Sequence, residues 1–180
     1  RSNVANANTE GESSEGKVND SFFACMKPVN EAILDIGATT RVAGKEWLLQ
    51  YGRNLKEAGV DVSGYRLAPS TCTIMFGAGG SKKSLGRLRV PVWIDGRRGT
   101  IETEVIEGDL PMLMGRGTMA RLGMVVDVDS GTVYFKNMKK FLRLPSTPRG
   151  HKLFPLSKES SYMKDILLLE GAESNASDAA

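Results

Sequence analysis

The apolar side chains of this chain are concentrated between two polar ends. Residues 1–21 are rich in Ser, Asn, Glu and Gly and lack large apolar residues. A segment of this kind cannot bury enough apolar surface to fold, so we expect residues 1–21 to be disordered. Residues 158–180 are also mostly polar, and we predict a mostly disordered tail there. The regular apolar patterns lie in residues 22–157, which we predict to be the one folded domain.

Strict alternation of apolar and polar positions predicts a pair of strands in the middle of this domain. From residue 88 to 94 apolar residues occupy every second position, and from 101 to 105 Ile, Thr and Val alternate with two glutamates. Alternation with a period of two places one row of side chains in the core and the other in solvent. The sequence Asp-Gly-Arg-Arg-Gly at 95–99 is typical of a turn. We therefore predict a half-buried hairpin.

Shorter apolar runs predict further strands. Runs of four to eight residues that are rich in aliphatic and aromatic side chains are typical of buried strands. They lie at 31–34, 71–76, 110–114, 125–128, 132–135, 141–144 and 151–156. Together with the hairpin, these runs predict a mainly β fold.

Two segments have helical rather than alternating spacing. Residues 45–58 carry apolar side chains that recur at the spacing of one helix face, namely Trp47, Leu48, Tyr51 and Leu55. Gly59 stands where a C-terminal helix cap belongs. A shorter helix is predicted over 118–122, ended by Gly123. We interpret the Trp47 stripe as core packing.

Composition and charge narrow the classes of function. Hydrophobic residues make up 41% of the chain and charged residues 25%, as in ordinary soluble proteins. The longest aliphatic run, 166–169, is far too short to span a bilayer, so we expect no membrane partner. Positive charge gathers in the middle of the chain without interleaved aromatic residues, which favours a solvated hairpin edge over nucleic-acid binding. The basic residues are Lys82, Lys83, Arg87, Arg89, Arg97 and Arg98.

The few cysteines and histidines exclude several kinds of site. Cys25 and Cys72 have no paired spacing, which fits a reducing compartment, so the expected location is the cytoplasm. His151 is the one histidine, which excludes multi-histidine metal sites, and no serine- or cysteine-protease signature accompanies it. We expect no metal and no cofactor. Because the chain begins with Arg1 rather than Met, we also expect it to be a segment of a longer precursor.

One carboxylate stands out from this pattern. The apolar run 31–34 leads directly to Asp35, which is followed by the tight-turn sequence Ile-Gly-Ala-Thr-Thr at 36–40. An acid at the end of a buried strand is costly unless its charge is managed. Gly37 lets the backbone fold closely around the carboxylate, so the layout suits a carboxyl group presented for chemistry. An ordinary Asp-X-Gly turn explains the same three residues.

The residues on both sides of Asp35 resemble a segment of a known protein family. Residues 32–48, AILDIGATTRVAGKEWL, resemble the active-site segment of retropepsin-type aspartic proteases, where apolar residues precede Asp-Thr/Ser-Gly-Ala-Thr/Ser. They look most like the proteases inside the polyproteins of copia-like LTR retrotransposons. The resemblance extends over about residues 30–156. It implies a closed-barrel-like retropepsin fold with one or two short helices.

The resemblance also implies roles for particular residues. Asp35 is the implied catalytic residue, within an active-site loop that continues through Ile36, Gly37, Ala38 and Thr39. A flap, the hairpin that closes over a bound peptide, corresponds to Phe76, Gly77, Ala78 and Gly79. Flexible glycines suit a lid of that kind. The second, structural motif of the family is matched by Leu113, Met114, Gly115 and Arg116.

Two positions depart from the family pattern. Ile36 stands where the family carries a Thr or Ser hydroxyl, which in the family bonds the partner loop across a dimer. An isoleucine side chain neither donates nor accepts such a bond. Retroviral members often pair the Arg of the second motif with an Asp just after Gly-Ala, but this chain has Thr39 and Thr40 there. Arg116 therefore lacks the carboxylate that this ion pair needs.

The chemistry of the family requires two carboxyl groups that share a proton. This chain supplies one Asp-X-Gly in the right frame, so the resemblance implies a homodimer that joins Asp35 from each copy and cleaves a polypeptide, a retroelement polyprotein. A second Asp-X-Gly, at Asp129, is interpreted as a hairpin turn because too few residues follow it to repeat the other motifs. The alternative function is a catalytically inactive retropepsin-fold module for dimerisation or interaction, disabled by Ile36.

Overall fold

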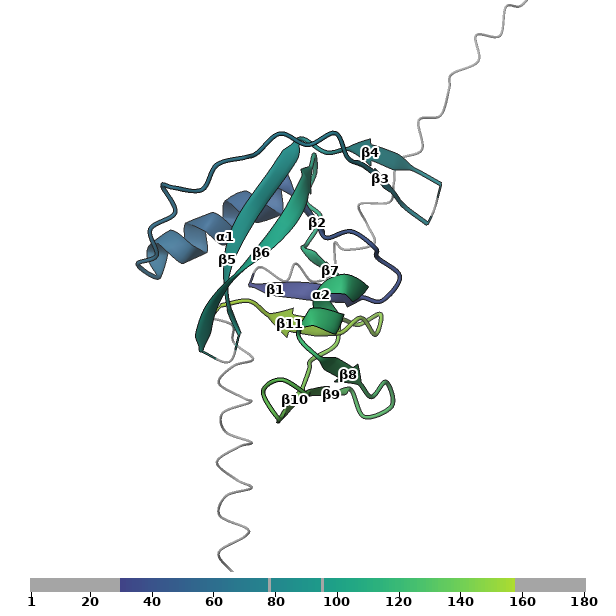
Figure 1. The fold of residues 1–180 in the computed structure, drawn as a ribbon. Coiled ribbons are helices and arrows are strands. Elements are labelled where there is room, and N and C mark those ends of the chain that lie inside the picture. The colour runs from purple at the N-terminus through teal and green to yellow at the C-terminus, as the bar shows by residue number, and fades with distance from the viewer. Residues whose placement is uncertain (1–29, 78, 95, 158–180) are drawn as a thin grey trace, which may run out of the picture.

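The structure is a computed structural model that describes residues 30–157 apart from 78 and 95 (Figure 1). The two predicted disordered ends, the start of the predicted domain at residue 22, and the flap residue Ala78 lie outside the described residues. Everything below concerns the described part of the chain.

A six-stranded mixed sheet forms the centre of the molecule, in the order β11-β1-β7-β2-β6-β5. Its strands are β1 (Glu31–Asp35), β2 (Val42–Gly44), β5 (Gly86–Ile94), β6 (Arg97–Ile106), β7 (Leu113–Gly115) and β11 (Leu153–Pro155). β1 runs parallel to β7 and β2 runs parallel to β6, whereas the other neighbours are antiparallel. β2 is only three residues long, too short to show an alternation of apolar and polar residues, and the sequence does not predict it.

The sheet is curled, so that its two ends approach each other (Figure 1). The backbone amide of Trp93 on β5 donates to the carbonyl of Leu156, directly after β11, at 2.7 Å. The buried hydroxyl of Tyr51 lies 2.9 Å from the carbonyl oxygen of Pro91 and 3.2 Å from that of Leu156. Burial raises the pKa of Tyr51, which keeps its hydroxyl protonated as a donor. The predicted mainly β fold with a barrel-like sheet and two short helices is confirmed.

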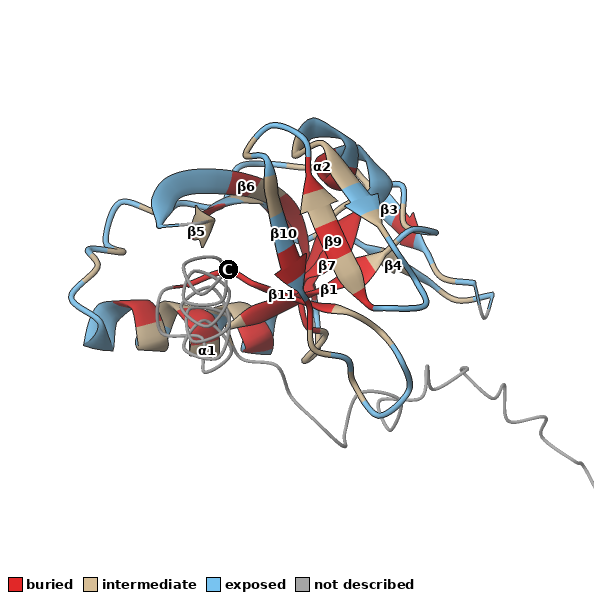
Figure 2. Ribbon diagram, turned by 90° about the horizontal axis from the view of Figure 1, so that it is seen from below, coloured by how far each residue is buried: buried red, intermediate tan, exposed pale blue. Residues whose placement is uncertain are grey.

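The central strand β1 is buried on both of its faces (Figure 2). Ala32 and Leu34 belong to the larger core cluster, and Ile33 belongs to a smaller one on the other face of the sheet. Because both faces are covered, β1 reads as a continuous apolar run instead of an alternating one. The same burial brings Asp35, the last residue of β1, to the edge of the core.

Both helices follow directly after short strands. α1 (Lys45–Glu57) buries Trp47, Tyr51 and Leu55, and the Trp47 and Tyr51 rings stack at 5.3 Å between centroids. The predicted helix and its core-facing stripe are confirmed, and Gly59 follows with φ +80°, a conformation that favours glycine. α2 (Arg116–Arg121) begins two residues earlier than predicted, because the chain enters it straight from β7 with Gly115 at the N-cap.

Two small sheets complete the fold. β8 (Met124–Val126), β9 (Thr132–Phe135) and β10 (Lys140–Arg143) form one, and β3 (Thr73–Met75) with β4 (Ser81–Lys83) forms the other. Between β8 and β9 the carboxylate of Asp127 accepts the backbone amide of Asp129 at 3.0 Å and the hydroxyl of Ser130 at 2.7 Å. The segment beginning at Asp129 is therefore a hairpin turn, as predicted.

Some predicted strands are longer than the observed ones. The run at 71–76 contributes only β3, and the run at 110–114 enters a strand only from residue 113. Residues 110–112 still bond to neighbouring strands: Gly44 donates to the carbonyl of Leu110 at 2.7 Å and Ile33 to that of Met112 at 2.8 Å. The run at 110–114 thus marks burial better than strand length, whereas in the run at 71–76 only Ile74 is buried. Within the described residues, no helix combines the length and apolar character that crossing a membrane requires.

Candidate active site

Asp35 lies where β1 ends and a tight turn begins. Its Oδ1 accepts the backbone amide of Gly37 at 2.9 Å and that of Ala38 at 3.2 Å, and its own carbonyl accepts the Ala38 amide at 3.1 Å. A Cβ on Gly37 would lie 3.3 Å from this Oδ1, so the close approach suits a residue without a side chain. Asp35 is partly exposed. The turn therefore fixes one carboxylate oxygen and presents the group to solvent.

The second predicted motif supports this turn from the neighbouring strand. Gly115 on β7 is the register partner of Asp35, and the Arg116 amide donates to the Ala38 carbonyl at 3.1 Å. A Cβ on Gly115 would lie 2.5 Å from the Ala38 carbonyl oxygen, so only glycine fits here without displacing the loop. Leu113 and Met114, the two apolar residues before it, are buried in the two core clusters.

The tip of the loop is exposed and apolar. Ile36 has 60% of its surface exposed, although it directly follows a buried strand. Gly37 and Thr39 are also exposed, while Ala38 is half-buried under the start of α2. The Asp35 turn therefore presents an apolar side chain to solvent at its tip.

The predicted flap lies at the tip of the β3–β4 hairpin. Phe76 donates to the Gly80 carbonyl at 2.8 Å, and the Gly79 amide donates to the Phe76 carbonyl at 2.9 Å, so the tip is a closed turn. Ile74 of β3 is buried in the smaller core cluster. The ammonium group of Lys82 on β4 donates to the Glu107 carbonyl at 3.1 Å, which ties the hairpin to the loop after β6. Gly77 is exposed within the turn.

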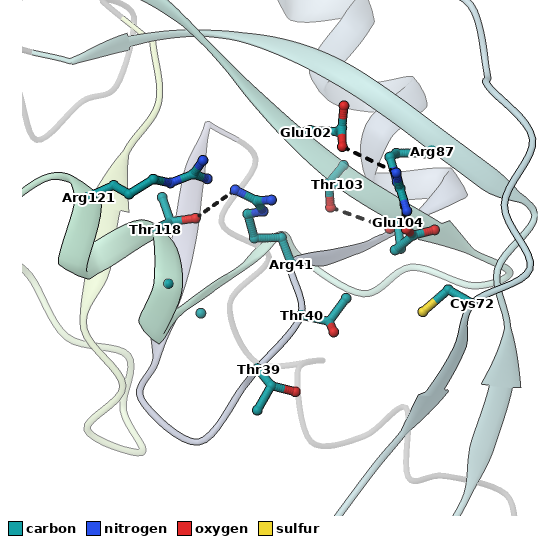
Figure 3. A pocket seen from close by; sticks show the side chains of 12 residues that line it. Thr39, Thr40, Arg41, Cys72, Arg87, Glu102, Thr103, Glu104, Thr118 and Arg121 are labelled. Atoms are coloured by element: carbon teal, nitrogen blue, oxygen red, sulfur yellow. Dashed lines mark hydrogen bonds and ion pairs between the residues drawn. The ribbon is translucent and has the colours of Figure 1, made fainter.

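A polar cavity of about 500 Å³ opens beside the Asp35 turn. Figure 3 shows its lining, which comes from the turn, from β5 and β6, and from α2. The lining residues are Thr39, Thr40, Arg41, Cys72, Arg87, Glu102, Thr103, Glu104, Gly115, Gly117, Thr118 and Arg121. We call it the Arg41 cavity. Apart from Thr39 and Gly115, none of these residues was predicted to belong to a site.

One side of the Arg41 cavity is a network of ion pairs. The Arg87 guanidinium lies 2.8 Å from the carboxylate of Glu104 and 3.5 Å from that of Glu102. Burial of Glu104 opposes its ionisation, but hydrogen bonds from Ser84, Ser70 and Arg87 outweigh burial and lower the pKa of Glu104. The predicted location of the basic residues on hairpin strands is confirmed, with Arg87 and Arg89 both paired to Glu102 across the strands.

The other side of the cavity carries two guanidinium groups. Arg41 donates from Nη1 to the Thr118 hydroxyl at 3.2 Å, which joins the end of the Asp35 loop to α2. Burial, together with the positive charge of Arg121, lowers the pKa of Arg41. Sequence spacing gave no signal for this contact, because Arg41 and Thr118 are 77 residues apart.

This contact stands where the family resemblance implied a different one. Arg116, the arginine of the second motif, is exposed, and its side chain makes no ion pair within the described residues. Its backbone amide and the Arg41–Thr118 bond hold α2 against the loop instead. In the contact between the loop and α2, the arginine is therefore Arg41 at the end of the loop, and α2 contributes the Thr118 hydroxyl.

Metal-ligating side chains do not cluster in the described part of the chain: no three His, Cys, Asp or Glu side chains come together there. Cys72, the described cysteine, is a partly exposed free thiol in the wall of the Arg41 cavity.

No protein-family model matches the sequence, and no curated protein matches it. Among solved structures, the chain is similar to the retroviral protease-like domain of Ddi1 from Leishmania major, with 24% identity, a TM-score of 0.40, and coverage of 62% of this chain and 82% of that one. It is also similar to the EIAV protease in complex with the inhibitor HBY-793, with 20% identity and a TM-score of 0.37. That match covers 51% of this chain and 75% of the other.

Proposed function

We propose that this chain is an aspartic endopeptidase of the retropepsin type, which acts as a homodimer on polypeptide substrates. The observation that carries the proposal is the geometry of Asp35. Its carboxylate stands at the end of a buried strand, one oxygen is fixed by two backbone amides at 2.9 and 3.2 Å, and the group remains accessible to solvent. A structural Asx turn needs no support from a neighbouring strand, whereas this one is packed against Gly115 on β7.

The mechanism requires a second carboxyl group, and the hydrogen bonds of Asp35 within the described residues go to its own turn. A second copy supplies the missing group when two Asp35 loops meet on a two-fold axis. Two carboxyls about 3 Å apart cannot both ionise, so one holds a proton while the other is charged. The charged group takes a proton from the attacking water, and the protonated group donates to the carbonyl oxygen of the scissile bond.

The surroundings of Asp35 favour such a pair. The amides of Gly37 and Ala38 hold Oδ1 in place, so that the carboxylate does not have to be ordered when substrate binds. The β3–β4 hairpin supplies a lid of the kind that excludes water from a closed site. The substrate of this reaction is a polypeptide, and in keeping with the sequence resemblance we assign it to the precursor of a copia-like retroelement.

Ile36 is the position at which this chain departs from the hydroxyl of the family motif. A hydroxyl at this position would add a hydrogen bond worth about 0.5–1.5 kcal/mol per copy. Burying an exposed isoleucine against a partner contributes a comparable amount, up to about 1.5–3 kcal/mol for a fully exposed side chain. Since 60% of Ile36 is exposed in the single chain, apolar contact across the dimer offsets much of the lost bond. The dimer is therefore retained.

The alternative function is an inactive dimerisation or interaction module, which the apolar tip at Ile36 also suits. Peptide cleavage by residues 22–157 from acidic to neutral pH separates the two functions, with Asp35→Asn and Ile36→Thr as variants. We expect cleavage that is abolished by Asp35→Asn and by a transition-state-mimicking inhibitor, and changed less than about tenfold by Ile36→Thr. A silent wild type that is activated by Ile36→Thr would establish a scaffold disabled at one residue. Silence of both, with dimerisation retained, would establish the interaction module.

A further inference from the structure

The Arg41 cavity has no role in the reaction described above, although it shares residues with the Asp35 site. Thr39 and Gly115 belong both to the support of the Asp35 turn and to the cavity wall. Gly115 is the register partner of Asp35 on the neighbouring strand, at the usual strand separation of about 4.8 Å. An extended peptide advances about 3.3 Å per residue. The cavity wall at Gly115 therefore lies within the span of a substrate residue a few positions from the scissile bond.

The charges in the cavity are unequally compensated. On the β5–β6 side, Glu102 and Glu104 are both paired with Arg87, and Glu102 is also 3.5 Å from the Arg89 guanidinium. Glu104 in addition accepts the Ser84 hydroxyl at 2.7 Å. These carboxylates are thus already neutralised by the protein. A cationic substrate group would have to compete with arginines that are held in place by the strand pairing.

The α2 side presents positive charge that is only partly offset, because burial and the charge of Arg121 lower the pKa of Arg41 by more than the charge of Glu102 raises it. The guanidinium groups of Arg41 and Arg121 point toward one another, with the Thr118 side chain beside them (Figure 3). Within residues 30–157, apart from 78 and 95, neither forms an ion pair with a carboxylate. Arg41 is half-buried, and its bond is to the neutral Thr118 hydroxyl. Two like charges held together at the edge of the core are stabilised by an anion placed between them.

The size and donor set of the cavity suit a carboxylate. A volume of about 500 Å³ lies within the range of ligand pockets and accommodates an amino-acid side chain. Planar guanidinium groups bind carboxylates through paired, charge-assisted hydrogen bonds. The hydroxyls of Thr39, Thr40 and Thr118 line the same space and are further donors.

We propose that the substrate of the Asp35 centre carries an acidic side chain that enters the Arg41 cavity and binds between the guanidinium groups of Arg41 and Arg121. This specificity rests on the proposed function of Asp35, since the cavity is assigned as part of its peptide-binding surface. Because the two-fold dimer carries one such cavity in each subunit, aspartate and glutamate are preferred at two positions placed symmetrically about the scissile bond. Glutamine is weaker at these positions, and lysine is weakest.

The test uses a library of eight-residue peptides in which each position in turn is Glu, Gln or Lys, with cleavage followed by mass spectrometry. We expect kcat/KM for Glu to exceed that for Gln by about tenfold at one position on each side of the scissile bond, the effect of a charge-assisted bond at a partly exposed site. The double variant Arg41→Gln/Arg121→Gln should bring this ratio close to one. Arg53→Gln, which removes an exposed arginine of α1, should leave the ratio as in the wild type. High salt should reduce the ratio, because it screens the exposed Arg121.

Different experimental outcomes contradict the proposed catalytic function and the proposed substrate specificity. Loss of all cleavage in the wild type would overturn the proposed function, whereas cleavage with equal rates for Glu and Gln peptides would overturn the specificity alone. A ratio that persists in the double variant would place the preference elsewhere and also overturn it. Independently of catalysis, the Asp35→Asn protein should bind fluorescein-labelled Glu peptides about tenfold more tightly than the matched Gln peptides. Equal binding contradicts the assignment of the cavity.

Discussion

At the scale of single residues, Gly115 links the fold to the candidate chemistry. It is buried on β7, it faces Asp35 in register, and any Cβ there would press on the Ala38 carbonyl. The requirement is steric, because the φ of Gly115 is −78°, a value that any residue adopts. A glycine with an ordinary backbone conformation is thus essential for the position of the Asp35 turn.

Gly115→Ala is expected to displace the turn and to destabilise the protein. Overpacking of this kind costs about 1–3 kcal/mol of unfolding free energy, measured by urea denaturation. A displacement of the carboxylate by about 1 Å should lower peptide cleavage by about 100-fold. For the unfolding measurement, Gly117→Ala is the matched control, since nothing lies within 4 Å of a Cβ at that position of α2. Equal stability of the two variants would show that the Ala38 loop tolerates the added atom.

Glu104 is expected to make the stability of the protein depend on acidic pH. Its folded pKa is lower than its unfolded pKa, because hydrogen bonds from Ser84, Ser70 and Arg87 outweigh the effect of burial. The stabilisation is therefore present above the unfolded pKa of about 4.3 and is lost as the pH falls through the lower folded pKa.

The measurement is the unfolding free energy from about pH 7 down to pH 2 in the wild type and in Glu104→Gln. The variant should lose about 1–3 kcal/mol at neutral pH and should show a weaker loss on acidification. Glu57→Gln, which changes an exposed carboxylate of α1, serves as the control and should follow the wild type. Parallel pH profiles for the wild type and Glu104→Gln would contradict the assignment.

At the scale of elements, the β3–β4 hairpin is held at its base and at one side. Ile74 packs into the smaller core cluster, and Lys82 bonds to the Glu107 carbonyl at 3.1 Å. Met75 and Lys83, the residues beside these two, are exposed. The hairpin therefore has one polar tie that a single substitution removes without touching the core.

Lys82→Met should loosen the hairpin by removing that tie. An exposed charge-assisted bond contributes about 0.2–1 kcal/mol, so amide exchange within β3 and β4 should rise by a factor of about 2–5. Lys83→Met, on the same strand and exposed, is the matched control and should leave exchange unchanged. Equal exchange in both variants would show that Ile74 packing alone holds the hairpin.

The elements differ in how well the sequence predicts them. α1 and the β5–β6 hairpin carry long periodic patterns, and Gly59 marks the helix end by its positive φ. β2 is three residues long, and its position is fixed by pairing with β6 and β7. A strand whose existence depends on its neighbours leaves too short a pattern to recognise.

The residues of the candidate site also differ in how well the sequence predicts their contacts. Asp35 and Gly37 form a local turn whose contacts span two or three residues, so the sequence motif contains most of its geometry. The Arg41 cavity is built from contacts such as Arg41 to Thr118, which only the folded chain brings together. Arg41 was visible in the sequence merely as the residue after the turn, with no periodic or motif signal to mark it.

At the scale of the whole molecule, the curled sheet places the candidate chemistry at one end of a closed core. Tyr51 and the Trp93–Leu156 bond join the two sheet edges, so β1 and β7 are central strands and are buried on both faces. A carboxylate at the end of such strands is held rigidly by the core. The core fixes the position of the Asp35 carboxylate, but a single chain contributes only this one carboxyl group at the end of β1 and β7.

Mixing of subunits tests whether the two carboxyls act together. In a freely exchanging mixture of equal amounts of wild type and Asp35→Asn, about one quarter of the dimers contain two Asp35 residues. Cleavage at constant total protein should therefore fall to about one quarter of the wild-type rate if the pair is required. If each Asp35 acted alone, the rate would fall only to about one half.

The control variant for this experiment is Asp129→Asn, which changes the other Asp-X-Gly of the chain at an exposed hairpin turn. Mixing it with the wild type should leave the rate per total protein unchanged, since both kinds of subunit keep Asp35. A quadratic fall with Asp35→Asn and no fall with Asp129→Asn would make the dimer the catalytic unit. A linear fall with Asp35→Asn would mean that each chain is complete by itself, and the two-fold arrangement of Asp35 would have to be abandoned.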